Sequence, residues 1–260
     1  MREFNCDGTI VGRPAQGILE QSLTQKYPIG TIFETFGRRY RYCRAAAAIT
    51  PARRGCPALI YDTWKASTAT TEPQFGSDGA TATGLAGDDF VIVTLAADYD
   101  TLRPVDCLQD GLLTLFDAAG LILDEHRIIG NDLSYTTTLA NDTVKIYIDP
   151  PLARAAVAVP CDGLPSPYNY CGDGGSVGTM TSVIVVNPIL VTSGYYFWGQ
   201  TRGPCWVTPN AGWQTAATRE AEWHTDGTIK AAAGVALQRA GYLLAECTDS
   251  DDAHIMLMLE

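Results

Sequence analysis

The chain has 260 residues, a mass of 27.9 kDa and a formal net charge of -11 at pH 7. Its 46% of hydrophobic residues can fill a core, which excludes a disordered chain. No segment reaches the roughly 18 apolar residues of a membrane helix, and the opening MREFNCDGTI lacks the apolar region of a secretion signal. We therefore expect a globular protein that has no membrane partner and is made without a signal peptide.

The first 30 residues are polar and contain many turn-forming residues. Within them, the stretch AQGILEQSLTQKY places Ile18, Leu19 and Leu23 near one face at helical spacing. We expect an extended arm with one short helix.

The next segment, GTIFETFGRRYRYC, alternates in character on both sides of a turn that contains glycine. This pattern predicts a β-hairpin. Its strands are predicted at residues 31–35 and 39–43. Because neighbouring side chains of a strand point to opposite faces, Tyr40 and Tyr42 should share one face and Arg39 and Arg41 the other.

Extended apolar runs separated by turn residues recur about every ten residues in the rest of the chain. We predict strands at residues 90–97, 111–118, 121–129, 135–140, 143–149, 181–191, 194–208, 227–234, 241–247 and 253–260. Residues 66–90 are rich in Thr, Ala and Gly and predict a loop or a weakly packed edge. The pattern predicts an all-β fold, mainly a β sandwich or barrel, with an extended N-terminal arm and little helix.

Charge divides the chain unevenly. Residues 1–65 contain ten Lys or Arg and five Asp or Glu, a net charge of +5, which leaves -16 on residues 66–260. We interpret residues 1–65 as a basic arm and hairpin that docks onto another protein, and residues 66–260 as an acidic, β-rich body.

The arginine-rich stretch FGRRYRYCR suggests nucleic-acid binding at first sight. Sustained phosphate binding needs a broad basic face, however, whereas this chain has a pI of about 4.6 and its positive charge is confined to one end. We expect no nucleic-acid partner and interpret the stretch as a protein-docking surface. The predicted contact residues are Arg38, Arg39, Tyr40, Arg41, Tyr42, Arg44, Arg53 and Arg54.

A second aromatic stretch, GYYFWGQTRGPCWV, places aromatic side chains on both faces of a predicted strand. Both faces then need an apolar cover, from the core or from a neighbouring subunit. The predicted core or subunit-interface residues are Tyr195, Tyr196, Phe197, Trp198 and Trp206.

The sequence offers little for catalysis or cofactor binding. Its three histidines have no metal-ligand spacing, its eight cysteines form no C-x-x-C pair, and it has no G-x-S-x-G motif. We predict no catalytic, cofactor-binding or metal-binding residues, and therefore a protein that is not an enzyme. Buried thiols are the expected state of the cysteines, although their spacing leaves open whether any pair.

The arginine-rich stretch FGRRYRYCR and the aromatic stretch GYYFWGQTRGPCWV, taken in this order, resemble segments of a group of structural proteins of tailed bacteriophages. In that group a segment of the form P-x-G, then G-R-x-Y-R-Y and Ala precedes a β-rich body, and a later G-Y-Y-F-W-x-Q-T-x-G segment follows. The matching residues here are Pro28, Gly30, Gly37, Arg38, Tyr40, Arg41, Tyr42, Ala45, Gly194, Tyr195, Tyr196, Phe197, Trp198, Gln200, Thr201 and Gly203. The stretches DPPL at 149–152 and PSPYNY at 165–170 also look like the group's pattern.

The resemblance implies a virion component, made in the host cytoplasm and located on the capsid surface. It implies a head decoration or cement protein, a homo-oligomer of two or three copies, whose partner is the major capsid protein. Such a protein can bind a lattice through many modest contacts, because avidity replaces a deep pocket.

Two other functions stay open at the level of sequence. A tail or fibre component could bind a host-surface glycan through exposed aromatics such as Trp213 and Trp223. A glycan-active enzyme is the other alternative, motivated by the many carboxylates and aromatics of a β-rich chain; it would need two carboxylates facing each other in a cleft.

Overall fold

The computed structural model describes residues 9–10, 13–50, 52–58, 80–94, 105–106, 108–117, 121–132, 143–173, 182–210, 219–232, 237–245 and 253–260. Within these ranges the chain forms sixteen β-strands and one turn of 3-10 helix, η1 (Pro167–Asn169), which confirms the predicted all-β class. None of the described segments is a helix long and apolar enough to cross a membrane.

The short helix predicted in the N-terminal arm is not formed. Residues 13–30 follow turns and bends, and the Glu20 amide donates to the Gly17 carbonyl at 3.1 Å. The side chains of Leu19 and Leu23 are 63% and 68% exposed. Without an apolar surface to cover one face, so short a helix lacks the packing that would stabilise it.

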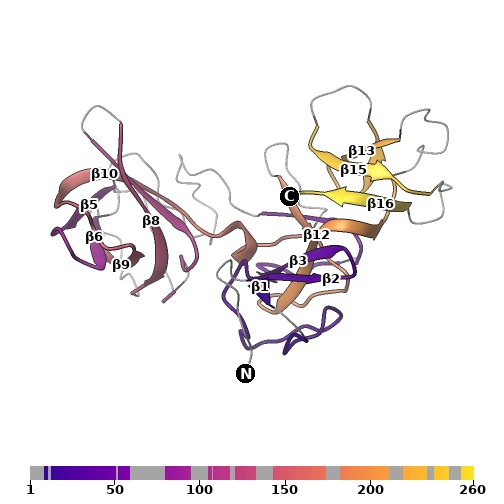
Figure 1. Ribbon diagram of the computed structural model, residues 1–260, viewed down its shortest axis with the longest axis horizontal. Coiled ribbons are helices and arrows are strands. Elements are labelled where there is room, and N and C mark those ends of the chain that lie inside the picture. Colours follow the sequence, from indigo (N-terminus) through magenta and orange to yellow (C-terminus); the bar gives the residue numbers. More distant parts are fainter. Residues whose placement is uncertain are drawn as a thin grey trace. The chain divides into compact units, whose positions relative to one another are not determined.

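The chain divides into two compact units, the first made of Met1–Leu59 and Pro167–Glu260 and the second of Ile60–Ser166 (Figure 1). This division differs from the two predicted regions, 1–65 and 66–260. The reason is that the predicted hairpin pairs with strands near the C-terminus, so the N-terminal segment and the C-terminal segment share one sheet.

The first unit contains a ten-stranded sheet. Its main order is β1-β2-β3-β12-β16-β15-β13-β14, and β11 pairs with both β12 and β4. The strands are β1 (Thr9–Ile10), β2 (Ile32–Thr35), β3 (Arg38–Arg44), β4 (Gly55–Pro57), β11 (Val183–Val186), β12 (Tyr196–Val207), β13 (Glu220–Trp223), β14 (Ile229–Ala231), β15 (Arg239–Leu243) and β16 (Ala253–Met258). The predicted hairpin is therefore confirmed as β2 and β3, which pair in antiparallel register.

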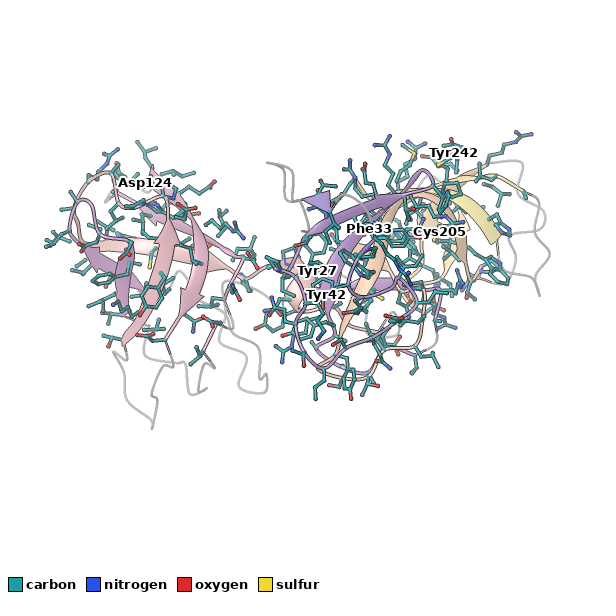
Figure 2. All side chains as sticks on the ribbon, turned by 60° about the horizontal axis from the view of Figure 1, so that its bottom comes forward. Tyr27, Phe33, Tyr42, Asp124, Cys205 and Tyr242 are labelled. Carbon is teal, nitrogen blue, oxygen red and sulfur yellow. The ribbon has the colours of Figure 1, made fainter. Side chains whose placement is uncertain are left out.

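One face of β3 forms an aromatic core. Tyr42 lies 5.3 Å from Tyr27 and 5.0 Å from Trp198, measured between ring centroids. Figure 2 shows Tyr27, Phe33 and Tyr42 gathered inside this unit. The Trp198 indole donates to the Gln16 carbonyl at 2.9 Å, so the arm is anchored to the core by a polar contact as well as by packing.

The second unit is a closed antiparallel barrel with the order β10-β5-β6-β9-β8-β7. Its strands are β5 (Thr81–Gly84), β6 (Phe90–Thr94), β7 (Leu112–Phe116), β8 (Ile122–Asn131), β9 (Thr143–Asp149) and β10 (Ala156–Leu164). Alternate residues point inward, and the core includes Val91, Leu113, Ile128 and Ile146. Closure leaves the strands without free edges.

The net charge of the protein belongs to the barrel. Residues 60–166 contain five Lys or Arg and sixteen Asp or Glu, a net charge of -11, whereas the first unit contains thirteen of each kind. The first unit is thus neutral overall, and its arginines act locally.

The described cysteines are free and buried, as expected. They are Cys43, Cys56, Cys161, Cys171 and Cys205. Burial raises the pKa of the Cys161 and Cys205 thiols to about 12, which keeps them protonated and unreactive near neutral pH.

Candidate docking surface

The two faces of β3 are used as the residue alternation predicts. Arg39 and Arg41 point away from the aromatic core. The Arg41 guanidinium donates to the Glu260 carboxylate at 2.7 Å and to the Gly30 carbonyl at 2.9 Å. Arg39 lies 2.7 Å from the Glu34 carboxylate and 3.6 Å from that of Glu260. These two arginines are therefore ion-paired within the chain.

The predicted contact residues Tyr40 and Tyr42 are corrected by the structure. Their exposed fractions are 1% and 0%, so neither side chain can touch another protein. The Tyr42 hydroxyl donates to the Gln16 side-chain carbonyl at 2.8 Å and accepts from the Lys26 amide at 3.1 Å. Because the sheet buries this face, both tyrosines are core residues.

The predicted contact residues Arg44, Arg53 and Arg54 are half-buried, and the guanidinium groups of the first two lie beside aromatic rings. The Arg44 guanidinium lies 6.0 Å from the centroid of the Tyr196 ring. The Arg53 guanidinium lies 5.3 Å from the centroid of the Trp206 ring. The Arg54 amide donates to the Asn187 side chain at 3.1 Å. Cation–π contacts and burial leave these side chains less available for a partner than predicted.

The aromatic stretch on β12 divides between core and surface. Phe197 and Trp198 are fully buried. Tyr195 and Tyr196 are half-buried, and the Tyr196 ring stacks on that of Tyr42 at 5.8 Å. Trp206 is 42% exposed. Four of the five residues therefore contribute to core packing, and Trp206 alone among them is largely on the surface.

The arginines that stay available lie around the tip of the β2–β3 hairpin. A shallow hollow of about 420 Å³ opens there, and we call it the hairpin hollow. It is lined by Glu34, Thr35, Phe36, Gly37, Arg38, Arg39 and Arg202. Three guanidinium groups and one carboxylate give the hollow an excess of positive charge in a chain of net charge -11.

The backbone holds the hairpin tip against β12. The two turn residues, Phe36 and Gly37, have φ angles of 48° and 70°, the left-handed conformation of a tight two-residue hairpin turn. Gly203 has a φ of 92°, and a Cβ atom there would lie 2.2 Å from the Gly37 carbonyl oxygen. Only a glycine permits this approach, which places Arg202 beside the tip.

An apolar surface continues from the hollow along β12, β16 and β15. Arg202 pairs with Met258, Pro204 with Met256, and Trp206 with His254 across the sheet. Met258 is 47% exposed and Tyr242, the partner of Met256 on β15, is 40% exposed. Figure 2 labels Tyr242 at the outside of this unit. We call Trp206, Tyr242, His254, Met256 and Met258 the outer face.

Charge and burial compete at Glu260. Partial burial raises the pKa of this carboxyl, but hydrogen bonds from Arg41 and from the Tyr168 hydroxyl, the latter at 2.7 Å, outweigh it. The pKa of Glu260 lies below its ordinary value as a result. The carboxylate stays charged near neutral pH and holds the end of β16 to β3 and η1.

Histidines and acids elsewhere form local contacts. The His224 ring lies 2.9 Å from the Asp226 carboxylate, which also accepts from the Thr228 amide at 3.0 Å. His126 is buried in the barrel, where its Nδ1 lies 2.7 Å from the Pro150 carbonyl. No group of three or more His, Cys, Asp or Glu in the described part of the chain is arranged to hold a metal ion.

Sequence reasoning missed most members of the hairpin hollow and the outer face, and Phe36, Arg202 and Met258 are examples. Phe36 reads as part of a turn, Arg202 as one residue of a core strand, and Met258 as the end of an apolar strand. Their grouping follows from the order β3-β12-β16, which no local pattern encodes. Trp223, predicted as a sugar-stacking residue, is only 4% exposed and packs in the core. Trp213 lies outside the described residues.

We compared the chain with protein-family models, with curated proteins and with solved structures, and none of the three comparisons gives a match.

Proposed function

We propose that this chain is a non-enzymatic structural protein of a tailed-bacteriophage virion. It serves as a head decoration or cement subunit, which binds the lattice of the major capsid protein and stabilises the shell. The observation that carries the proposal is the pairing of β3 with β12. The two segments that resemble the phage group lie side by side, with Tyr42 opposite Trp198 and Tyr40 opposite Gln200.

This pairing supports the proposal because it makes the two resembling segments one structural element. Arg41 of the first segment lies opposite Gly199 of the second, and the Tyr42 ring of the first packs against Trp198 of the second. The resemblance therefore falls on two adjacent strands in the middle of the sheet of the first unit.

The distribution of charge and apolar surface suits a lattice-binding subunit. The first unit is neutral overall and carries the hairpin hollow and the outer face, whereas the barrel holds the whole net charge of -11. A neutral unit can approach a crowded shell without long-range repulsion, and an acidic unit keeps the free subunit soluble. Many copies on one lattice then add modest contacts into stable binding.

The proposal is tested on heads of the encoding phage that were assembled without this protein. Purified chain should bind these heads up to a fixed number of copies, and the decorated heads should withstand a higher temperature before they release DNA. Purified tails of the same phage are the control, since they present a different virion surface to the same protein. Binding to tails in the absence of binding to heads would replace the head role with a tail role, and binding to neither would reject both.

A further inference from the structure

The tip of the β2–β3 hairpin presents an aromatic ring that the described part of the fold does not use. Phe36 is 96% exposed, the largest exposed fraction among the large hydrophobic side chains that the structure describes. Its φ of 48° is a conformation that bulky residues rarely adopt and that Asn or Gly would occupy without strain. A strained, fully exposed phenylalanine at a hairpin tip is a feature typical of binding surfaces.

Two arginines beside Phe36 have charges that are not neutralised within the described residues. Arg38 lines the hollow and pairs with no carboxylate of the described residues. Arg202 likewise lies in no ion pair formed by the described residues, although it is exposed and lines the hollow. Arg39 differs, because Glu34 and Glu260 already neutralise it.

The site is held in place before any partner arrives. The Arg39 guanidinium bridges to Glu34 across the two strands of the hairpin at 2.7 Å. The Gly203 backbone lies against the Gly37 carbonyl on the other side of the tip. A rigid hairpin loses little conformational freedom on binding, so its contacts contribute more fully to affinity.

We propose that Phe36, Arg38 and Arg202 form the centre of a protein-docking site whose partner presents Asp or Glu carboxylates beside an apolar pocket. The guanidinium groups bind the carboxylates, and the phenyl ring enters the pocket. The inference rests on the proposed function in one respect, because it assumes that the partner is a protein of the capsid shell. Charge complementarity selects an acidic partner, since a basic one would meet two uncompensated arginines.

A protein partner is favoured over a nucleic acid. The hollow contains only two guanidinium groups that pair with no carboxylate of the described residues, whereas stable binding to a polyphosphate requires many. An apolar pocket also accounts for a phenyl ring that stands clear of the surface.

The partner chemistry is tested in solution with protein in which the arginine side-chain nitrogens are labelled with ¹⁵N. The probe is the peptide acetyl-Asp-Leu-Glu-amide, and its matched control is acetyl-Asn-Leu-Gln-amide. The acidic probe should shift the Nε–H resonances of Arg38 and Arg202 at least several times more than that of Arg239, which is exposed and paired with Glu220. Equal shifts from both peptides, or equal shifts at Arg239, would overturn the inference.

Two further readings of the same spectra identify other occupants. Stronger shifts with a single-stranded DNA 12-mer than with the acidic peptide would replace the protein partner with a nucleic acid. Shifts that grow with protein concentration in the absence of any probe would identify a second copy of this chain as the occupant. Either result overturns the inference in its stated form.

Binding to heads separates this inference from the proposed function. The double variant Arg38→Ser, Arg202→Ser and the variant Phe36→Ser should each bind heads at least roughly tenfold more weakly than the wild type, and Arg239→Ser should bind as the wild type does. Wild-type affinity in the first two variants overturns the docking site and leaves the proposed function standing. If the wild type itself fails to bind heads, the proposed function falls, and the peptide titration decides the partner chemistry by itself.

Discussion

The Arg41 guanidinium and the Glu260 carboxylate lie 2.7 Å apart, although 219 positions separate them in the chain. Their side chains are 24% and 18% exposed, so the ion pair is partly shielded from solvent. Arg41 projects from β3 and Glu260 follows β16, and β12 lies between these strands in the sheet. The contact therefore ties the N-terminal hairpin to the last strand across the centre of the first unit.

Replacing Glu260 with Gln tests this tie. The folded pKa of the carboxyl lies below its ordinary value of 4.5, so its stabilisation is complete above that value and is lost as the pH falls through the folded pKa. We expect the free energy of unfolding of Glu260→Gln to be lower by roughly 1–2 kcal/mol at pH 7. The deficit should shrink towards about pH 3. Urea titrations at both pH values measure it, and a deficit independent of pH would contradict an ionic role.

The strained hairpin tip predicts a variant that is more stable than the natural chain. Phe36→Asn suits the left-handed turn and should raise the free energy of unfolding by up to ~1 kcal/mol. It should also weaken binding to the partner, because the ring is lost. Phe36→Leu is the control, since it keeps both the strain and an apolar side chain. Thermal unfolding monitored by circular dichroism gives the answer, and a destabilised Phe36→Asn variant would argue that the ring packs within the chain.

The approach of β12 to the hairpin tip is tested by two glycines with similar backbone angles. Gly203 and Gly194 have φ values of 92° and 78°, but a Cβ at Gly194 would meet nothing within 4 Å. Gly194→Ala should therefore lower the free energy of unfolding by about 1–2 kcal/mol, the cost of placing alanine in the left-handed conformation. Gly203→Ala should lower the free energy of unfolding by roughly 1–3 kcal/mol more than Gly194→Ala, because the new Cβ atom clashes with the Gly37 carbonyl. Chemical denaturation measures both variants. If they lose the same free energy of unfolding, the hairpin tip can move away from β12 and avoid the clash.

The buried hydroxyl of Tyr42 makes two hydrogen bonds, and burial raises its pKa to about 12. Tyr42→Phe should lower the free energy of unfolding by about 1–3 kcal/mol, because the side-chain carbonyl of Gln16 loses its donor in the core. Tyr242→Phe, on the exposed outer face, should change it by less than ~0.5 kcal/mol. Guanidinium titrations of the three proteins make the comparison. A neutral Tyr42→Phe variant would mean that water replaces the hydroxyl.

The barrel has its own core, so a cavity in that core should destabilise the barrel before it affects the first unit. Ile146 is fully buried, and Ile146→Ala should lower the stability of the barrel by about 2–5 kcal/mol. Hydrogen exchange should speed up at the amides of β6 and β9, while those of β3 and β12 keep their protection. Ile92→Ala, at a 43% exposed position of the same barrel, is the control. Equal acceleration in both units would show that they unfold together.

Strands with clear alternation were predictable from the sequence, and others were not. The predicted strand at 143–149 is β9, and the predicted strand at 194–208 contains β12. By contrast, β10 contains Pro160 and Gly163, which weaken a strand signal, and it forms because closing the barrel gives it partners on both sides. The strand predicted at 135–140 lies outside the described residues.

The sequence by itself determined the all-β class, the β2–β3 hairpin and the separation of Arg39 and Arg41 from Tyr40 and Tyr42, because a period of two depends only on neighbours along one strand. It could not determine which arginines stay free. Glu260 pairs with Arg41 and reaches Arg39, which Glu34 also neutralises, and Arg202 joins Arg38 at the hairpin tip. Both arrangements exist only because β12 lies next to β3 and β16 lies next to β12. Strand order depends on contacts between distant segments, and so the docking surface was decided by the tertiary structure.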